Sequence, residues 1–528
     1  MWTLPTFALV LLTAANGANA YGVPFRYGDR STQACSGMWV SRDTFINVTL
    51  DREYSAGQLE MLIYEAADEH YIGRPHRSTL SSKVYFCNPW NIKGGVCTEE
   101  ERGHFLFNLP SGMSLSNTSI RTTRLVFPAA EHHSFFASLG SPLPVQDQVP
   151  YSQPKQTHLL APRAEEASDD RRTPLAGLEV EYMYPVHYPV QKTGYYCVAY
   201  RPVLPAPPYK HPIIHSVYKG TVLFHNGFAG RLPAADYAKL VFYAVTFSLY
   251  SLFAILWGTL YWRNRKDTPP IHTSLSAILG LTTLYTLLML AHFVIMNSKK
   301  RGHPSSILHL AAHVVRAAYY TLTLAALLTI GHGITFVGGD RSWSRLMKFC
   351  VCCQSILHFI FGTLYAYAMI LGLEYPVKEV VLEKLGKVLV PLEVITAIFI
   401  VWFMLACIAT LKRMSSRTLR PTREKIIFTG CTFVLALTIY LALHVYFIYR
   451  SLNHTHYQRI AADEWQHLWL TDGPAAGWRE MVYMPAFLIT LWIWRPSEAK
   501  FAYEELPRGD DRVEAGGAVE RNGGEGGT

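Results

Sequence analysis

Residues 240–262 read LVFYAVTFSLYSLFAILWGTLYW, an apolar run without a charged side chain. About 20 such residues cross the hydrocarbon core of a bilayer as a helix. Backbone amides in hydrocarbon need internal hydrogen bonds, so a chain with several such runs forms a helical bundle. We predict a seven-transmembrane bundle over residues 236–496. Its seven segments, the last and shortest of which needs residues from Gly477 onward, are Leu240–Trp262, Ile271–Met296, Ile307–Phe336, Leu346–Leu373, Val388–Leu411, Ile426–Tyr449 and Met481–Trp494.

The N-terminus has the pattern of a signal peptide. Phe7–Ala15 forms a short apolar core, and Ala18-Asn19-Ala20 matches the small-x-small pattern at which signal peptidase cuts. We therefore predict that residues 1–20 are removed, that Tyr21 begins the mature chain and that residues 21–235 are luminal.

Three glycosylation sequons agree with this orientation. Asn47 and Asn117 lie in the region predicted to be luminal, and Asn453 lies between the sixth and seventh segments, on the same side by parity. The cytosolic loops then carry most of the loop arginines and lysines, as the positive-inside rule requires, although Lys299–Arg301 falls in a luminal loop. These signals predict a luminal N-terminus and a cytosolic C-terminus.

Composition argues against a nucleic-acid-binding protein. The chain has 528 residues, of which 50% are hydrophobic and 16% charged, and its net charge is +9. Because the basic residues gather in loops beside the apolar segments, they indicate topology and not a nucleic-acid surface. The partner that composition predicts is the lipid bilayer.

The cysteines divide between the two regions. Cys35, Cys87, Cys97 and Cys197 precede the bundle, and four cysteines in an oxidising compartment allow two disulfides with three connectivities. We favour Cys87–Cys97, which closes a local loop, together with Cys35–Cys197. The other five cysteines lie in or near the apolar segments, where packing is the favoured role of Cys352 and Cys353 and palmitoylation is the alternative.

The region before the bundle has the pattern of an antiparallel β-sandwich. Short alternating or apolar runs are bounded by turn residues, and residues 141–176, rich in proline, serine and charge, form an insertion that we expect to be disordered. The tail over residues 497–528 is acidic and glycine-rich and is expected to be disordered too. The predicted strands are Thr44–Leu50, Leu59–Tyr64, Lys83–Cys87, His104–Leu109, Arg121–Phe127, Glu179–Met183, Gly194–Tyr200 and Gly220–His225.

Several short motifs occur in the order typical of one family. Lys219–Tyr237 carries a strand, an Asn-Gly-aromatic turn and the Leu-x-Ala-x-Asp-Tyr entry into the first segment; the others are Gly194–Val198, Gly331–Ile334, Trp494–Ser497 and Phe501–Leu506. In these motifs the chain resembles the lung seven-transmembrane-receptor family, Golgi-localised seven-span proteins with a GOLD-like luminal domain, and its tail resembles the fungal members. His332 stands where the family usually has tyrosine, and Lys299–Arg301 is not typical of it. The resemblance implies a Golgi membrane protein that cycles through endosomes and the cell surface.

Polar groups inside the segments are the candidate site. An ionisable side chain at mid-membrane costs about 2.5–3.5 kcal/mol on insertion scales, so it usually faces a cavity or a partner. His309, His313 and Arg316 share one face of the third segment, Glu393 lies just after Pro391 at the luminal end of the fifth, and His444 lies in the sixth. We predict that His313, Arg316, Glu393 and His444 line a hydrated cavity. The alternative is that Arg316 pairs with a buried carboxylate or carbonyl, that the histidines join helices, and that His309 lies among the headgroups.

No catalytic motif is present. The sequence has no His-Glu-x-x-His, phosphate-loop or Gly-x-Ser-x-Gly pattern, and His132-His133 and His454-x-His456 have no further ligands at metal-site spacing. We therefore expect no enzyme activity, cofactor or metal.

Three functions fit these patterns. The first is Golgi and endosomal protein trafficking, in which the luminal domain binds cargo or a ligand and Tyr503 and Leu506 form a Tyr-x-x-Leu signal for a sorting adaptor. The second is an ion or pH-regulating conduit that uses the intramembrane histidines and charges. The third, a G-protein-coupled receptor, rests on topology alone, because the Asp/Glu-Arg-Tyr and Asn-Pro-x-x-Tyr elements are missing.

Overall fold

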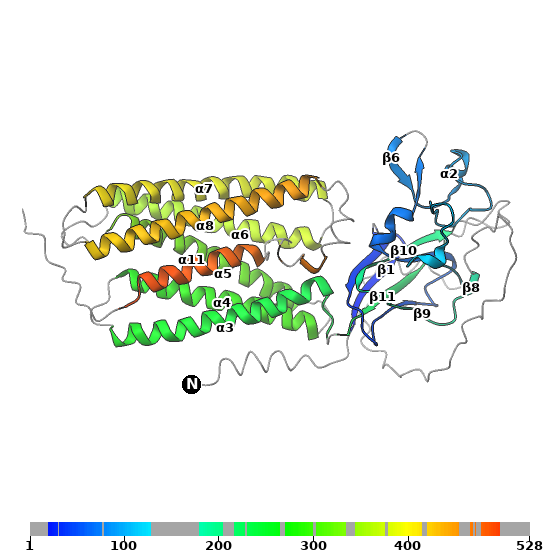
Figure 1. The fold of residues 1–528 in the computed structure, drawn as a ribbon, viewed down its shortest axis with the longest axis horizontal. Helices are drawn as coiled ribbons and strands as arrows, with labels where there is room; N and C mark the ends of the chain where they lie inside the picture. The colour runs from blue at the N-terminus through cyan, green and yellow to red at the C-terminus, as the bar shows by residue number, and fades with distance from the viewer. Residues whose placement is uncertain are drawn as a thin grey trace, which may run out of the picture. The chain divides into compact units, whose positions relative to one another are not determined.

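The computed structural model describes the ordered helices and strands of the chain. The described residues are 20–29, 31–76, 79–127, 179–203, 216–227, 230–264, 270–298, 303–333, 344–374, 378–413, 420–453, 465–467, 470 and 477–496. Residues 1–19 of the predicted signal peptide, the insertion 141–176, and the tail with Tyr503 and Leu506 lie outside them. The chain divides into an N-terminal unit, Tyr21–Gly227, and a helical unit that follows it (Figure 1).

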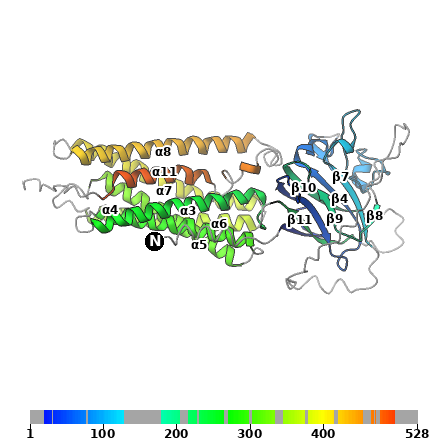
Figure 2. The same ribbon diagram turned by 60° about the horizontal axis from the view of Figure 1, so that its bottom comes forward.

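Two sheets form the N-terminal unit. One has the order β1 (Tyr21–Arg26), β11 (Lys219–His225), β3 (Phe45–Leu50) and β9 (Val186–Pro189). The other has the order β2 (Gln33–Met38), β10 (Gly194–Val203), β4 (Gly57–Glu65), β7 (Arg121–Phe127) and β8 (Glu179–Glu181). Figure 2 labels β11 of the first sheet and β10 and β4 of the second.

Alternating side chains join the two sheets. Ile46 and Val48 of β3 and Met61 and Ile63 of β4 are buried in one apolar core between the sheets. A sandwich core of this kind is what alternating apolar and polar residues produce when one face of each sheet is covered. The predicted β-sandwich is therefore present.

A second layer covers the outer face of the β4 sheet. Leu62 and Tyr64 point away from the sandwich core and pack with Phe105 and Ile120 of the segment between β4 and β7. That segment contains the short elements η1 (Ala66–Tyr71), β5 (Arg74–His76), β6 (Thr79–Val84), α2 (Pro89–Lys93) and η2 (Leu115–Asn117).

The strand predictions were partly wrong. His104–Leu109 contributes only isolated bridges, Phe86 with Phe105 and Ile72 with Phe107, because its side chains pack on the sheet from outside it. The strand expected at Lys83–Cys87 ends instead at Val84. Four strands were not predicted, because they are short or interrupted by proline and glycine: β1, β2, β5 and β9.

One strand pair departs from the expected antiparallel order. β7 and β8 are parallel, with Leu125 opposite Val180. A parallel pair needs a crossover of a dozen residues or more, and the connection between these strands, residues 128–178, is long enough.

Both favoured disulfides are present. Cys35 of β2 and Cys197 of β10 lie opposite each other in the ladder, with their Cα atoms 4.1 Å apart. Cys87 and Cys97 close a loop with a sequence separation of 10. The five remaining cysteines are free thiols in the helical unit.

In the described part of the helical unit, seven long helices overlap the predicted segments: α3 (Ala234–Arg263), α4 (Pro270–Ser298), α5 (His303–Gly331), α6 (Arg345–Glu374), α7 (Lys378–Arg413), α8 (Arg420–Asn453) and α11 (Gly477–Ile493). The first six are long and apolar enough to cross a membrane. α11 has 17 residues and rises about 25 Å, slightly less than the roughly 30 Å of a hydrocarbon core. The third segment was predicted to reach Phe336, but α5 ends at Gly331, after which Gly333 has a φ of 64°.

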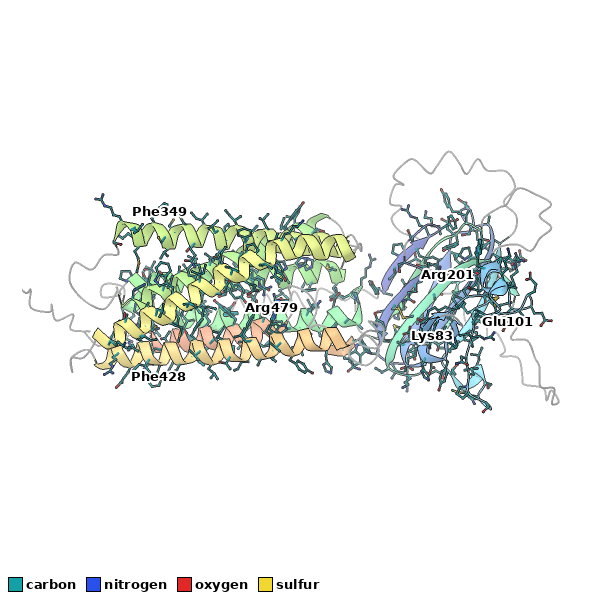
Figure 3. All side chains as sticks on the ribbon, turned by 90° about the horizontal axis from the view of Figure 1, so that it is seen from above. Lys83, Glu101, Arg201, Phe349, Phe428 and Arg479 are labelled. Carbon is teal, nitrogen blue, oxygen red and sulfur yellow. A yellow bond between two sulfur atoms is a disulfide. The ribbon has the colours of Figure 1, made fainter. Side chains whose placement is uncertain are left out.

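The outer faces of these helices are apolar. Phe349 of α6 and Phe428 of α8 point away from the bundle (Figure 3) and are 66% and 61% exposed. α5 contacts α4, α6 and α7, and α11 contacts α8. Apolar side chains outside and polar ones inside are what a lipid environment selects.

Candidate functional site

An ion pair lies inside the helical unit. Nε of Arg316 on α5 is 3.7 Å from Oε1 of Glu480 on α11, and the two side chains are 10% and 5% exposed. The hydroxyl of Tyr319 donates to the same Oε1 at 3.0 Å, and the Arg316 guanidinium lies 5.4 Å from the centre of the Tyr320 ring. The pair thus joins α5 to the last helix of the bundle.

Tyrosines surround this ion pair. The hydroxyls of Tyr243 on α3 and Tyr285 on α4 are 3.1 Å apart, and the Tyr285 and Tyr319 rings have centroids 5.6 Å apart. Tyr319 also packs on Tyr483 of α11, whose hydroxyl lies 2.8 Å from Oγ1 of Thr323. These contacts link α3, α4, α5 and α11 in one polar aromatic layer.

Three histidines extend the site along α4 and α5. The rings of His292 and His309 stack with centroids 4.5 Å apart, and Nε2 of His309 is 2.9 Å from Nε2 of His313. His309 is therefore packed between two imidazoles.

The start of α3 is fastened to the end of α4. The backbone N–H of Leu232 donates to Oδ1 of Asn297 at 3.2 Å, and that of Arg231 donates to the Asn297 carbonyl at 3.0 Å. Gly230 has a φ of 124°, and a Cβ there would lie 1.9 Å from Oδ1 of Asn297. Only glycine fits this approach, which lies within the motif that resembles the family's entry into its first span.

The four cavity candidates are not brought together. His313 and Arg316 are buried one turn apart, but Glu393 of α7 is exposed and has no ion-pair partner among the described residues. His444 of α8 is partly buried and stacks on Tyr440 with centroids 5.9 Å apart. The carboxylate that meets Arg316 is Glu480 instead.

Sequence reasoning missed Glu480, His292 and His358. Nδ1 of His358 lies 2.7 Å from Oγ1 of Thr321, which joins α6 to α5. The signal for Glu480 was available, because the seventh segment reaches a useful length only if it begins before this residue. Among the described residues no group of three histidine, cysteine or acidic side chains could hold a metal ion.

The glycosylation candidates differ in accessibility. Asn117 is exposed at the end of η2. Asn47 lies within β3, and its Oδ1 is buried with no hydrogen-bond partner among the described residues. Asn453 ends α8, and its side chain lies outside the described ones.

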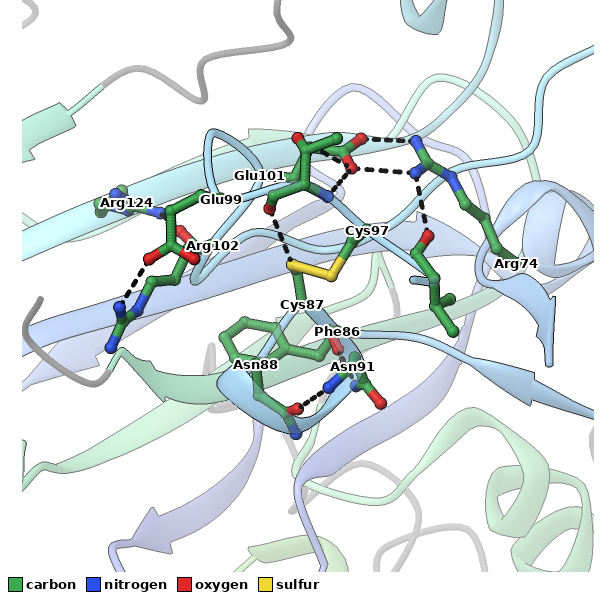
Figure 4. The surroundings of a disulfide bond; sticks show 12 residues. Arg74, Phe86, Cys87, Asn88, Asn91, Cys97, Glu99, Glu101, Arg102 and Arg124 are labelled. Carbon is green, nitrogen blue, oxygen red and sulfur yellow. Dashed lines mark hydrogen bonds and ion pairs between the residues drawn. A yellow bond between two sulfur atoms is a disulfide. The ribbon is translucent and has the colours of Figure 1, made fainter. Parts of the chain in front are cut away.

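The surroundings of Cys87–Cys97 are held by local polar contacts (Figure 4). Oδ1 of Asn88 accepts from the backbone N–H of Asn91 at 2.9 Å and caps α2. Arg74 donates through both terminal nitrogens to Glu101, at 3.0 and 2.6 Å. This rigid segment presents Trp90, which is 79% exposed.

Two family models match the chain. The GOST, seven transmembrane domain, matches residues 238–500, and the PTM1-like, N-terminal domain, matches residues 31–134. These matches cover the helical unit and much of the N-terminal unit.

Curated relatives are distant in sequence. An uncharacterised protein of Schizosaccharomyces pombe is 23% identical over 90% of this chain and 80% of its own length. Membrane protein PTM1 of Saccharomyces cerevisiae is 21% identical over 92% of this chain and 83% of its own. Transmembrane protein 87A of Homo sapiens is 24% identical over 54% of this chain and 48% of its own length, so this alignment spans about half of the human protein.

Proposed function

The chain belongs to the lung seven-transmembrane-receptor family, and from this membership we propose that it supports protein trafficking in Golgi and endosomal membranes. In this proposal the N-terminal unit lies in the lumen and binds cargo. The helical bundle anchors the N-terminal unit to the membrane, and the C-terminal tail contacts a cytosolic sorting adaptor.

One contrast carries the proposal: the buried charges Arg316 and Glu480 of the bundle pair with each other, whereas the N-terminal unit has its own core and exposed aromatic side chains. Arg316 and Glu480 pair inside the bundle, so neither is left to bind a ligand without breaking that pair. In the N-terminal unit Trp90 and Tyr184 are 79% and 78% exposed. Exposed aromatics of this kind are typical anchors of protein interfaces.

The disulfides support the proposed orientation. Cys35–Cys197 and Cys87–Cys97 both lie in the N-terminal unit, and the five thiols of the helical unit are free. Disulfides form and persist in the secretory lumen or outside the cell and are rare in the cytosol.

The proposed adaptor contact depends on the tail. Tyr503 and Leu506 fit the Tyr-x-x-Leu form of a sorting signal, in which an extended segment adds to a sheet edge and two side chains fill alternate pockets. The test is to image the tagged full-length chain and its Tyr503→Ala variant. We expect the parent chain in Golgi and endosomes and the variant shifted to the cell surface. Residence of both at the cell surface would refute the proposal.

The histidine row favours a second function, a pH-regulated conduit. His309 stacks on His292, and its Nε2 lies 2.9 Å from Nε2 of His313; imidazole is the side chain whose unperturbed pKa lies near the pH of mildly acidic compartments. Purified chain in liposomes should then carry current that changes in a His313→Phe variant. Absence of current across a range of pH and voltage would exclude this function.

A further inference from the structure

Three charged side chains form a row across the outer face of the β4 sheet. Arg201 of β10 lies opposite Glu60 of β4, and Glu60 lies opposite Arg124 of β7. All three alternate with residues of the sandwich core, so they share the face that points away from it. The row therefore places one carboxylate between two guanidinium groups.

The Glu60 carboxylate pairs with Arg124, one of its two arginine neighbours in this row. Its Oε2 accepts from Nε of Arg124 at 3.2 Å, and its Oε1 lies 3.3 Å from Nδ1 of His104. The Glu60 side chain is 1% exposed, so solvent does not compete for these contacts. Arg201 is exposed and forms no ion pair with any residue that the structure describes.

A cavity of about 200 Å³ opens beside Arg201. Tyr27, Phe86, Pro89 and Pro202 supply apolar walls, and Arg102 lies on its border. None of the described residues that line it is acidic. Arg102 is already paired with Glu99 at 2.8 Å, so Arg201 is the arginine of this cavity that has no carboxylate partner among the described residues.

Gly103 lines the cavity and lies against the charge row. It has a φ of 76°, and a Cβ at this position would lie 2.6 Å from Cγ1 of Val203 and 3.2 Å from Nη2 of Arg124. Any other residue would displace β10 or the arginine that holds Glu60. The position of Arg124 in the charge row thus depends on this glycine.

The edge of the cavity presents an aromatic platform. Asn88 and Pro89 line the cavity, and the next residue, Trp90, is 79% exposed with Nζ of Lys93 lying 5.6 Å from its ring centre. Because α2 is capped by Asn88 and fastened by Cys87–Cys97, this platform is fixed in place before any ligand arrives.

We propose that this cavity binds an acidic side chain from an extended peptide of a partner protein, with the carboxylate paired to Arg201 and a neighbouring apolar residue packed on Trp90. The volume supports a single side chain, because drug-sized ligands occupy about 300–1,000 Å³. Arginine is suited to a carboxylate, since its planar group donates two parallel hydrogen bonds. The inference rests on the proposed function in one respect, that the partner protein is cargo.

The experiment measures binding of two labelled peptides to the purified full-length chain. The probes are Ser-Phe-Glu-Phe-Ser and the same peptide with glutamine in place of glutamate. We expect the glutamate peptide to bind about tenfold more tightly or better, the factor expected of one charge-assisted hydrogen bond. The preference should weaken as salt is raised, because Arg201 is exposed. Equal binding of the two peptides would overturn the proposal.

Variants then assign the preference to one residue. Arg201→Gln should remove it, and Arg42→Gln, which deletes an exposed arginine that does not line the cavity, should retain it. Arg201→Glu should instead prefer a third peptide, Ser-Phe-Lys-Phe-Ser, over the other two. An Arg201→Gln chain that keeps the preference would overturn the assignment. If that variant misfolds, Arg201→Lys, which keeps the charge, must retain the preference for the proposal to stand.

The failure of this inference is distinct from the failure of the trafficking proposal. Loss of peptide binding in Arg201→Gln with unchanged cellular location would support the site and separate it from sorting. Anionic vesicles that bind through Arg201 while the peptides do not would replace the peptide by a lipid surface and overturn the inference.

Discussion

Arg316 on α5 and Glu480 on α11 form an ion pair inside the helical unit, with Nε and Oε1 3.7 Å apart. The two residues are separated by the whole of α6, α7 and α8 in the sequence. Two opposite charges in an apolar bundle stabilise it only when both are present, because each alone is an uncompensated buried charge. The pair therefore fixes the last and shortest helix against α5.

Removing one partner of this pair should destabilise the bundle. We expect Glu480→Gln or Arg316→Met to lower the free energy of unfolding by about 3–5 kcal/mol, the usual result of leaving one buried charge. The Arg316→Met, Glu480→Met double variant should recover part of that loss. Denaturation of the purified chain in detergent measures this. Glu393→Gln, at an exposed carboxylate, is the control, and a loss in Glu480→Gln no larger than in Glu393→Gln would contradict the prediction.

The two disulfides should contribute unequally. Cys35–Cys197 spans a sequence separation of 162 and Cys87–Cys97 a separation of 10. Loop-closure entropy predicts that removing them costs about 5 and about 3 kcal/mol respectively. The measurement compares the Cys35→Ala, Cys197→Ala chain with the Cys87→Ala, Cys97→Ala chain in chemical denaturation. A greater loss for the shorter loop would show that its local contacts dominate over chain entropy.

His225 should make the N-terminal unit less stable in acid. Burial lowers the pKa of His225, and the nearby Asp43 carboxylate opposes that shift. The unfolded chain then takes up a proton near pH 6.5 before the folded chain does, so stability present above that pH is lost as pH falls toward the folded pKa. We expect the thermal unfolding midpoint to be lower at pH 5.5 than at pH 7.5. This difference should be smaller in the His225→Gln chain. An equal effect of His70→Gln, at an exposed histidine, would argue against this assignment.

A hydrogen bond at the end of α11 should be important for its docking. Nε1 of Trp494 donates to Oγ1 of Thr429 on α8 at 2.9 Å, and both residues are buried. Thr429→Val removes this acceptor while keeping the shape, and we expect it to cost about 1–3 kcal/mol. Thr429→Ser retains the hydroxyl and should cost less. Thermal unfolding of the three chains in detergent provides the comparison, and equal losses in both variants would attribute the effect to packing.

Local patterns were sufficient for some elements and not for others. The helices α3 and α4 match their predicted segments closely, because apolar length is a property of consecutive residues. β7 was predicted at its observed bounds, Arg121–Phe127, since its threonines, valine and phenylalanine are residues that favour strands. β1 was missed, because a six-residue strand with an internal proline gives a weak signal and is defined by its pairing with β11.

The site was less predictable than the fold. The spacing of His313 and Arg316 placed them on one helix face, but spacing cannot say which carboxylate approaches from another helix. Glu393 was expected to line one cavity with Arg316, and the structure leaves it exposed while bringing Glu480 to Arg316. Likewise, nothing in the sequence near Arg201 indicates that Glu60 lies opposite it in the sheet.

The sequence by itself determined that this chain is a β-rich unit followed by a bundle of membrane-spanning helices, because alternation and apolar length are written in neighbouring residues. Only the tertiary structure decided which of the three disulfide connectivities forms, which carboxylate meets Arg316, and that Glu60 pairs with Arg124 and not with Arg201 among the residues that the structure describes. The physical reason is that strand register and helix packing bring together side chains from distant parts of the chain, and the energy of a buried charge depends on those neighbours.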